Sequence, residues 1–296
     1  MGFFAALLLL TEPGTRVVDE AVTSLGATYT VRSDTAPFPA AGGGARRRAR
    51  YNDDTVMVFV PSAWCAPADG GVDSVVFYHG HFDTAANAMV SKRLREQLVK
   101  SRKQAWLVVP QLARDAHDSS AGQLEKPDGL RRLLEAVFGV VARRPQRRCG
   151  EAVSRVPLVP KLGAVVVAAH SGGFQGAAFA VSKGGVAVRD VVLFDALYGF
   201  SARFSRWLAD DPARRLTHVY RPGPGNRMVV KWTKSLEKAL RYHDVPFVER
   251  EGGRFVVVPE RVLFLRTDVP HGDVPAANDL FGEWLYHAPL RAPSVR

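Results

Sequence analysis

The sequence predicts an α/β fold with a mostly parallel central sheet and helices on both faces. Short apolar runs rich in β-branched residues alternate along the chain with amphipathic helical patterns. Such alternation is typical of strands joined by crossover helices, which form parallel sheets. Polar residues follow directly on several of the apolar runs, and ligands and catalytic groups gather at the carboxyl ends of parallel strands.

The chain is long enough to bury a large core. It has 296 residues, of which 47% are hydrophobic and 23% charged, which suits one large domain. We expect this domain over residues 51–296, preceded by an irregular basic lead-in over residues 1–50. The first ten residues are apolar, but they lack the basic start of a signal peptide and are too short to span a bilayer as a helix. We therefore expect a soluble protein, with its export undecided.

The expected strands are short and buried. They cover residues 55–60, 73–78, 106–110, 164–169, 190–194, 217–220 and 261–266. Apolar residues at helical spacing predict helices over residues 85–101, 130–141, 174–181, 202–209 and 228–242, and a closing helix around residues 280–285. Adjacent glycines at Gly252 and Gly253 suggest a hairpin between the last long helix pattern and the last strand.

Residues 162–174 carry the most information about function. An apolar, β-branched run stops abruptly at Ser171, which is followed by Gly172 and Gly173. This pattern predicts a buried strand that turns sharply into a helix and presents the serine hydroxyl, as in the Gly-x-Ser-x-Gly nucleophile elbow. Ala169 stands at the first glycine position. Small residues are required there because the nucleophile has strained dihedrals and close neighbours.

A nucleophilic serine needs a base, and the base needs an orienting acid. His271 is the best base, because it follows the last expected strand and lies in a loop of small residues. Asp195 is the best acid, because it ends the strand directly after the elbow unit and the next strand end, residues 220–226, has no carboxylate. Asp268, just before His271, is the alternative acid.

These motifs together resemble those of the α/β-hydrolase family, and the resemblance covers residues 55–290. The chain order Ser, Asp, His and the His79-Gly80 pair after a strand both match the family's pattern. The resemblance implies oxyanion-hole N–H donors at His81 and Gly172 and hydrolysis of an ester or amide through an acyl-enzyme, without a cofactor. Ala169 and the position of the acid are the two departures from that pattern.

We expect four further residues to contact substrate. They lie at strand ends or in the polar loop of residues 114–128 that follows the third expected strand, and they are His79, His170, Asp83 and Asp115. His170 has a second interpretation as a packed, hydrogen-bonded histidine beside the nucleophile, and the polar loop has a second interpretation as a solvated connector.

Two other functions compete with the serine hydrolase. The run His79-x-His81-x-Asp83 also resembles the ligand run of metallo-β-lactamase-like hydrolases, although Thr84 stands where that family has a further histidine. The formal net charge of +11, with arginine-rich stretches at residues 46–50 and 143–148, would instead suit an inactive scaffold that binds an anionic polymer. Cys65 and Cys149 lie outside any metal-ligand spacing, and they could form one disulfide or none, with unlinked thiols as the default expectation.

Overall fold

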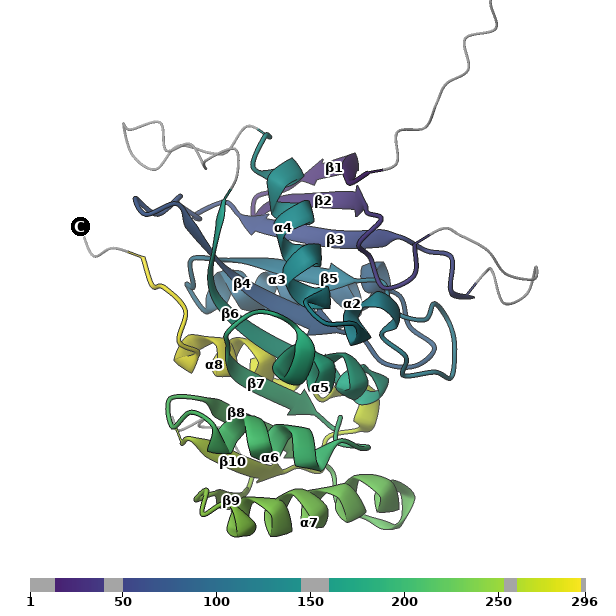
Figure 1. The fold of residues 1–296 in the computed structure, drawn as a ribbon, viewed down its shortest axis with the longest axis vertical. Helices are drawn as coiled ribbons and strands as arrows, with labels where there is room; N and C mark the ends of the chain where they lie inside the picture. The colour runs from purple at the N-terminus through teal and green to yellow at the C-terminus, as the bar shows by residue number, and fades with distance from the viewer. Residues whose placement is uncertain (1–13, 40–49, 145–159, 253–259, 294–296) are drawn as a thin grey trace, which may run out of the picture.

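The computed structural model describes residues 14–39, 50–144, 160–252 and 260–293. Within these ranges, ten strands form one sheet in the order β1-β2-β3-β5-β4-β6-β7-β8-β10-β9 (Figure 1). The strands from β5 to β9 in this order are parallel to their neighbours, whereas β1, β2 and β3 pair antiparallel and β3 is also antiparallel to β5. The predicted α/β class with a mostly parallel sheet is confirmed.

The elements follow one another in the alternating order that the sequence predicts. The strands are β1 Arg16–Val22, β2 Gly26–Arg32, β3 Thr55–Pro61, β4 Gly71–Tyr78, β5 Ala105–Pro110, β6 Lys161–His170, β7 Val188–Phe194, β8 Arg215–Tyr220, β9 Val248–Glu251 and β10 Val262–Arg266. The α-helices are α2 Ala85–Ser91, α3 Leu94–Lys100, α4 Gly129–Val141, α5 Phe174–Lys183, α6 Ser201–Ala209, α7 Arg227–Tyr242 and α8 Leu280–His287.

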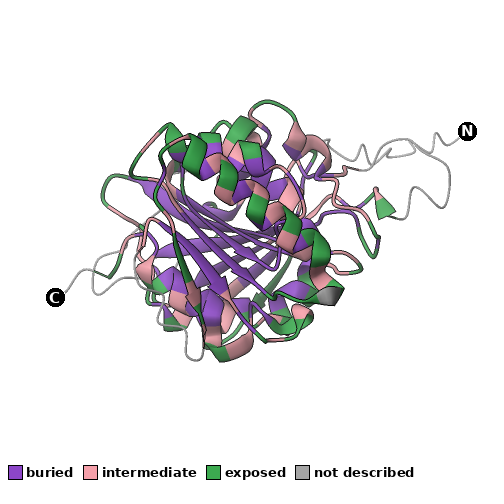
Figure 2. Cartoon of the chain, turned by 90° about the horizontal axis from the view of Figure 1, so that it is seen from below, coloured by how far each residue is buried: buried purple, intermediate pink, exposed green. Residues whose placement is uncertain are grey.

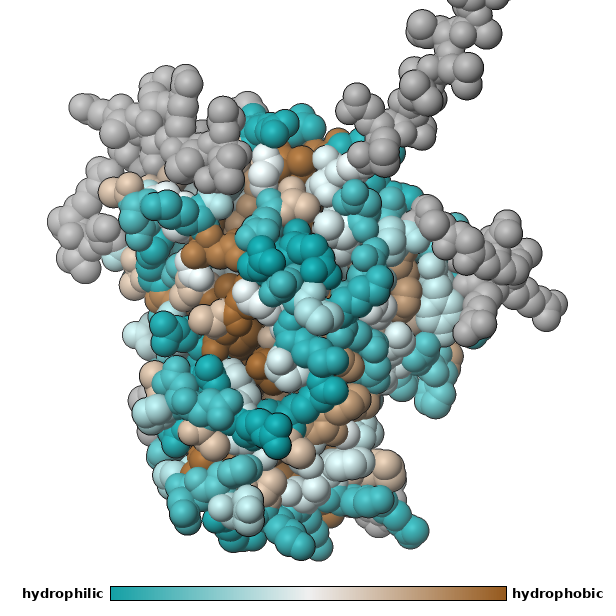
Figure 3. All heavy atoms as spheres, in the orientation of Figure 1, coloured by the Kyte–Doolittle hydropathy of each residue, from teal (hydrophilic) through white to brown (hydrophobic). Residues whose placement is uncertain are grey.

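Helices cover both faces of the sheet. α4, α5, α6 and α7 pack on one face, in a hydrophobic cluster that includes Phe138 and Phe204. α2, α3 and α8 pack on the other, in a cluster that includes Met89 and Trp284. β4 and β5 are buried over their whole length, as expected for strands covered on both faces. Figure 2 shows the buried sheet between helices whose outer sides are exposed, and Figure 3 shows that the face with α4, α5, α6 and α7 is mostly hydrophilic.

The expectation of an irregular lead-in over residues 1–50 is wrong for residues 16–32, which form β1 and β2. β2 pairs with β3 along its full length, from Gly26 opposite Pro61 to Arg32 opposite Thr55. β1 is almost entirely exposed, as suits a charged strand at the sheet edge. The two strands were missed because their apolar residues alternate with charged and hydroxyl residues instead of forming a run.

One further element differs from the expected one. The helix expected over residues 85–101 is divided into α2 and α3 at Arg93, whose φ of 51° lies in the left-handed region and interrupts the helix. The hairpin expected around Gly252 and Gly253 lies partly outside the described residues, and its described part, β9, pairs with β10 in parallel. No helix in the described ranges is both long and apolar enough to cross a membrane.

Of the two states left open for the cysteines, the default of unlinked thiols is wrong at the described position. Cys65 is disulfide-bonded, so it is not the unlinked thiol that its isolated place in the sequence predicts. Cys149 lies outside the described residues.

Candidate active site

The nucleophile position is built by the sharp turn between β6 and α5. β6 ends at His170, and Ser171 has a φ of 51°, a left-handed conformation that is rare for serine. A Cβ atom on Gly172 would lie 2.2 Å from Cδ2 of His81, and one on Gly80 would lie 2.8 Å from Cβ of Ser171. Glycine is therefore required on both loops, because the turn after β6 and the loop after β4 are in direct contact.

The structure brings Ser171, His271 and Asp195 together in one hydrogen-bonded chain. Nε2 of His271 lies 2.8 Å from Oγ of Ser171, and Nδ1 of the same ring lies 2.6 Å from Oδ2 of Asp195. These three residues follow β6, β10 and β7, whose carboxyl ends lie at the same edge of the sheet. With Nδ1 donating to the carboxylate, Nε2 is free to accept the serine proton.

Asp195 is held in its charged form by its neighbours. Its side chain is 1% exposed, and burial alone would raise its pKa, but the hydrogen bonds from His271 and Asn226 outweigh burial and hold the pKa below its usual value. The side-chain amide of Asn226 donates to Oδ1 at 2.7 Å. Asp268 is exposed, and within the described ranges its side chain has no hydrogen bond or ion pair that would orient His271.

Asn226 is a site residue that the sequence reasoning missed. The strand end at residues 220–226 was used only for its lack of a carboxylate, yet it supplies this amide. Asn226 also donates to the backbone carbonyl of Arg221 at 3.0 Å, so one side chain fixes both the carboxylate and the loop after β8. The sequence did offer a signal for this role: Asn226 is a polar residue after β8, the strand next to β7, which carries Asp195 at its end.

The backbone N–H groups of His81 and Gly172 lie on the two loops that touch beside Ser171. In the described part of the chain, the N–H of His81 donates to no protein acceptor. Gly172 lies in the first turn of the short helix Ser171–Gly173, where N–H groups have no acceptor within the helix. The ring of His81 is held aside by Ser119, with Nε2 and Oγ 2.7 Å apart.

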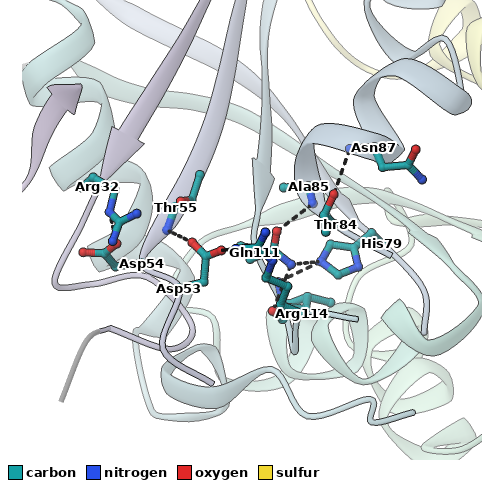
Figure 4. Close-up of polar contacts among 11 residues, drawn as sticks. Arg32, Asp53, Asp54, Thr55, His79, Thr84, Ala85, Asn87, Gln111 and Arg114 are labelled. Carbon is teal, nitrogen blue, oxygen red and sulfur yellow. Dashed lines mark hydrogen bonds and ion pairs between the residues drawn. The ribbon is translucent and has the colours of Figure 1, made fainter. Parts of the chain in front are cut away.

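His79, which was expected to contact substrate, is buried and hydrogen-bonded within the protein, and this position favours a structural role. It is 1% exposed, its Nδ1 donates to the carbonyl of Gly80, and its Nε2 accepts from the backbone N–H of Leu112 at 2.9 Å. The side chain of Gln111, directly after β5, bridges His79 to the backbone N–H of Ala85 at the start of α2 (Figure 4). His79 thus ties together the loops after β4 and β5.

His170 has the packing role that was one of its two interpretations. It is 6% exposed, and its Nε2 donates to the backbone carbonyl of His271 at 2.9 Å. The two rings lie against each other with centroids 5.1 Å apart. Desolvation by burial lowers the pKa of His170 to about 3, so the ring is neutral at neutral pH. We assign it the positioning of the His271 loop instead of contact with substrate.

This burial makes the stability of the fold depend on pH. The folded-state pKa of His170 is about 3 and the unfolded value is 6.5, so the unfolded chain binds a proton first as pH falls. Stability is fully present above pH 6.5 and is lost as pH falls from there towards 3, by about 2 kcal/mol at pH 5 from this residue. His170→Gln keeps a donor for the carbonyl and removes the titration. The free energy of unfolding of each protein is measured in urea at pH 7.5 and at pH 5.0. Between these two values, the free energy of unfolding of the His170→Gln variant should fall by about 2 kcal/mol less than that of the native chain. An equal fall in both proteins would refute the assignment.

The three residues of the alternative metal run have separate partners. His79 is bonded to Leu112, His81 to Ser119, and Oδ1 of Asp83 accepts from Thr84 N–H and the Asn87 side chain at the start of α2. Within the described ranges, no three histidine, cysteine or acidic side chains form a group that could hold a metal ion. The pattern His-x-His-x-Asp therefore reflects three different local roles.

The polar loop after β5 reaches the site. Its Ala116 carbonyl accepts from the N–H of Phe82, and its His117 ring stacks on Phe82 with centroids 5.7 Å apart. Asp115, which was expected to contact substrate, is exposed in this loop, and its backbone N–H donates to the carbonyl of Asp83 at 3.3 Å. Of the arginine-rich stretches, residues 46–49 and 145–148 lie outside the described residues, so the scaffold hypothesis stays untested there.

Three observations together decide the fold. They are the sharp turn at Ser171 after a central parallel strand, the His-Gly loop in contact with that turn, and the Ser, Asp, His order at three strand ends. The chain has an α/β-hydrolase fold. No protein-family model and no curated protein matches this α/β-hydrolase-like chain.

Solved structures similar to this α/β-hydrolase fold include a ferulic acid esterase, with 10% identity, a TM-score of 0.49, and coverage of 92% of this chain and 95% of that one. They also include FphF, a fluorophosphonate-binding serine hydrolase of Staphylococcus aureus, with 10% identity, a TM-score of 0.49 and coverage of 88% and 98%. The S-formylglutathione hydrolase FrmB of the same organism has 11% identity, a TM-score of 0.49 and coverage of 92% and 98%. At these values the substrate of this chain has to be inferred from its own site.

Proposed function

We propose that the protein is a serine hydrolase that cleaves an ester through a Ser-His-Asp triad and an acyl-enzyme. The observation that carries the proposal is the hydrogen-bonded chain from Ser171 through His271 to Asp195, with the serine at a left-handed turn. An amide bond is the alternative substrate for the same machinery.

In the first half of the reaction, Oγ of Ser171 attacks the ester carbonyl while Nε2 of His271 takes its proton. The N–H groups of His81 and Gly172 donate to the oxyanion that forms. Asp195 holds the imidazole in the tautomer that accepts at Nε2 and stabilises the imidazolium. The carbon–oxygen bond to the leaving group then breaks as His271 passes the proton to the leaving oxygen.

In the second half, a water molecule replaces the leaving group. His271 accepts a proton from that water, the hydroxide attacks the acyl carbonyl, and the bond to Oγ breaks as the proton returns to Ser171. His170 and Asn226 touch neither reacting atom. They hold His271 and Asp195 respectively, through the contacts at 2.9 and 2.7 Å.

Labelling with a fluorophosphonate probe tests the activated serine. We expect the native chain to be labelled, and both Ser171→Ala and His271→Ala to lose the label, because the phosphonylated oxygen is Oγ and its nucleophilicity depends on the base. The label should be the same with and without a chelator. Absence of labelling in a folded native chain would contradict the proposal, and chelator-sensitive hydrolysis without labelling would favour the metal alternative.

A further inference from the structure

A cavity of about 420 Å³ opens directly beside the proposed triad, on the side of His271 and Asp195. Its other walls include Tyr198, Arg221 and Asn226, so it lies between the loop after β7 and the loop between β8 and α7. Cavities that bind small organic ligands have volumes of about 300–1,000 Å³. The hydrolytic mechanism described above uses none of this space.

The position of the cavity assigns it to the leaving group. In the step that breaks the ester, His271 must hand its proton to the leaving oxygen, so that oxygen lies within hydrogen-bond reach of the imidazole. The group attached to it then extends along the ring of His271. His271 is one of the residues that line the cavity, and Ser171 is not among them.

The charge of the cavity points to an anion. Arg221 contributes a cation, is exposed, and among the described residues has no carboxylate within ion-pair distance. The acid in the wall, Asp195, is buried and has both carboxylate oxygens occupied, by Asn226 and by His271. Until it passes its proton to the leaving oxygen, His271 is an imidazolium and offsets the charge of Asp195, so the uncompensated charge beside the cavity in the tetrahedral intermediate is that of Arg221.

Polar groups that accompany the guanidinium are already positioned. Asn226 holds the backbone carbonyl of Arg221 and receives the hydroxyl hydrogen bond of Tyr198 at 3.4 Å. This fixes the base of the Arg221 side chain while leaving its guanidinium free. A guanidinium in this state binds carboxylate or phosphate with two parallel hydrogen bonds.

We propose that this cavity is a leaving-group subsite for an anion, so that the preferred substrates are esters whose alcohol part carries a carboxylate or a phosphate, bound by Arg221. This inference rests on the proposed serine hydrolase mechanism. It specifies the alcohol part of the substrate and leaves the acyl part open.

The kinetic test compares two esters with the same acyl group: phenyl acetate and 3-carboxyphenyl acetate. For the native chain, kcat/KM for the carboxylated ester should exceed that for the neutral ester at least about tenfold, the size of one charge-assisted contact. Arg221→Gln should remove this preference and Arg221→Lys should keep part of it. Lys238→Gln makes the same charge change on an exposed face of α7, about 17 Å along the helix from its start, and should keep the native ratio. A ratio that is the same in Arg221→Gln and in the native chain overturns the inference.

A binding test separates this inference from the hydrolytic mechanism. In the Ser171→Ala background, calorimetry should detect 3-hydroxybenzoate, the carboxylated leaving group, and adding Arg221→Gln should weaken its binding at least about tenfold. Binding that depends on Arg221, together with a native chain that neither hydrolyses the esters nor reacts with the fluorophosphonate probe, would support an anion site in this cavity and overturn the serine hydrolase. Hydrolysis of both esters, with binding of 3-hydroxybenzoate unchanged by Arg221→Gln, would support the serine hydrolase and overturn the anion subsite.

Discussion

Replacing Ser171 by alanine is expected to lower kcat/KM for phenyl acetate by about 10⁴- to 10⁶-fold, to the level that binding and the oxyanion hole alone provide. Oγ of Ser171 is the atom that forms the acyl bond, and no other hydroxyl lies in hydrogen-bond contact with Nε2 of His271 among the described residues. His271→Ala should lose a similar factor, because the serine then keeps its proton. The measurement is initial rates of phenol release with purified variants.

A variant that lacks both Ser171 and His271 tests whether the two residues act together. Because Ser171 and His271 act as one unit, Ser171→Ala combined with His271→Ala should be no slower than either single variant. Multiplying losses would show that the two residues act independently, which contradicts the hydrogen-bonded chain at 2.8 Å. Circular dichroism and unfolding midpoints confirm that the variants are folded; His271 is half exposed, so its replacement leaves the core unchanged.

Replacing Asp195 by asparagine is expected to lower kcat by about 10⁴-fold. The side chain keeps its shape, but the amide no longer stabilises the imidazolium or the tautomer that accepts at Nε2. The contact that is changed is the short one of 2.6 Å between Oδ2 and Nδ1 of His271. The measurement is kcat for the same ester at neutral pH.

Asp268→Asn is the matched control for this variant. It makes the same chemical change three residues before His271, at an exposed carboxylate. We expect its kcat to stay within about threefold of the native value, as is usual for surface substitutions away from structural contacts. A large loss in Asp268→Asn together with a small one in Asp195→Asn would move the acid from the strand end of β7 to the loop after β10.

The strand ends that carry the proposed triad could be predicted from the sequence because each follows a buried apolar run. Such runs, for example that of β6 before Ser171, are visible without knowledge of the fold. β1 was missed because it is almost entirely exposed and carries charged residues, and β2 because Thr and Arg interrupt its apolar residues. The division at Arg93 was missed because a left-handed residue leaves no mark on helical periodicity.

The residues around the triad were harder to predict than the triad itself. A histidine at a strand end can face substrate or tie loops together, and sequence spacing does not distinguish the two; the hydrogen bond of His79 to Leu112 does. Asn226 was missed because an amide has no charge to suggest catalysis, although its hydrogen bond stabilises the ionised Asp195. The partner of each side chain, and not its type, decides its role.

The most direct test of the account is the mass of the protein after reaction with 4-nitrophenyl dimethylcarbamate, whose carbamoyl-enzyme hydrolyses slowly. We expect one dimethylcarbamoyl group on the native chain, located to Ser171 by peptide mapping, and none on Ser171→Ala. Release of nitrophenol by the native chain with no adduct, or with the adduct on another residue, would contradict Ser171 as the nucleophile.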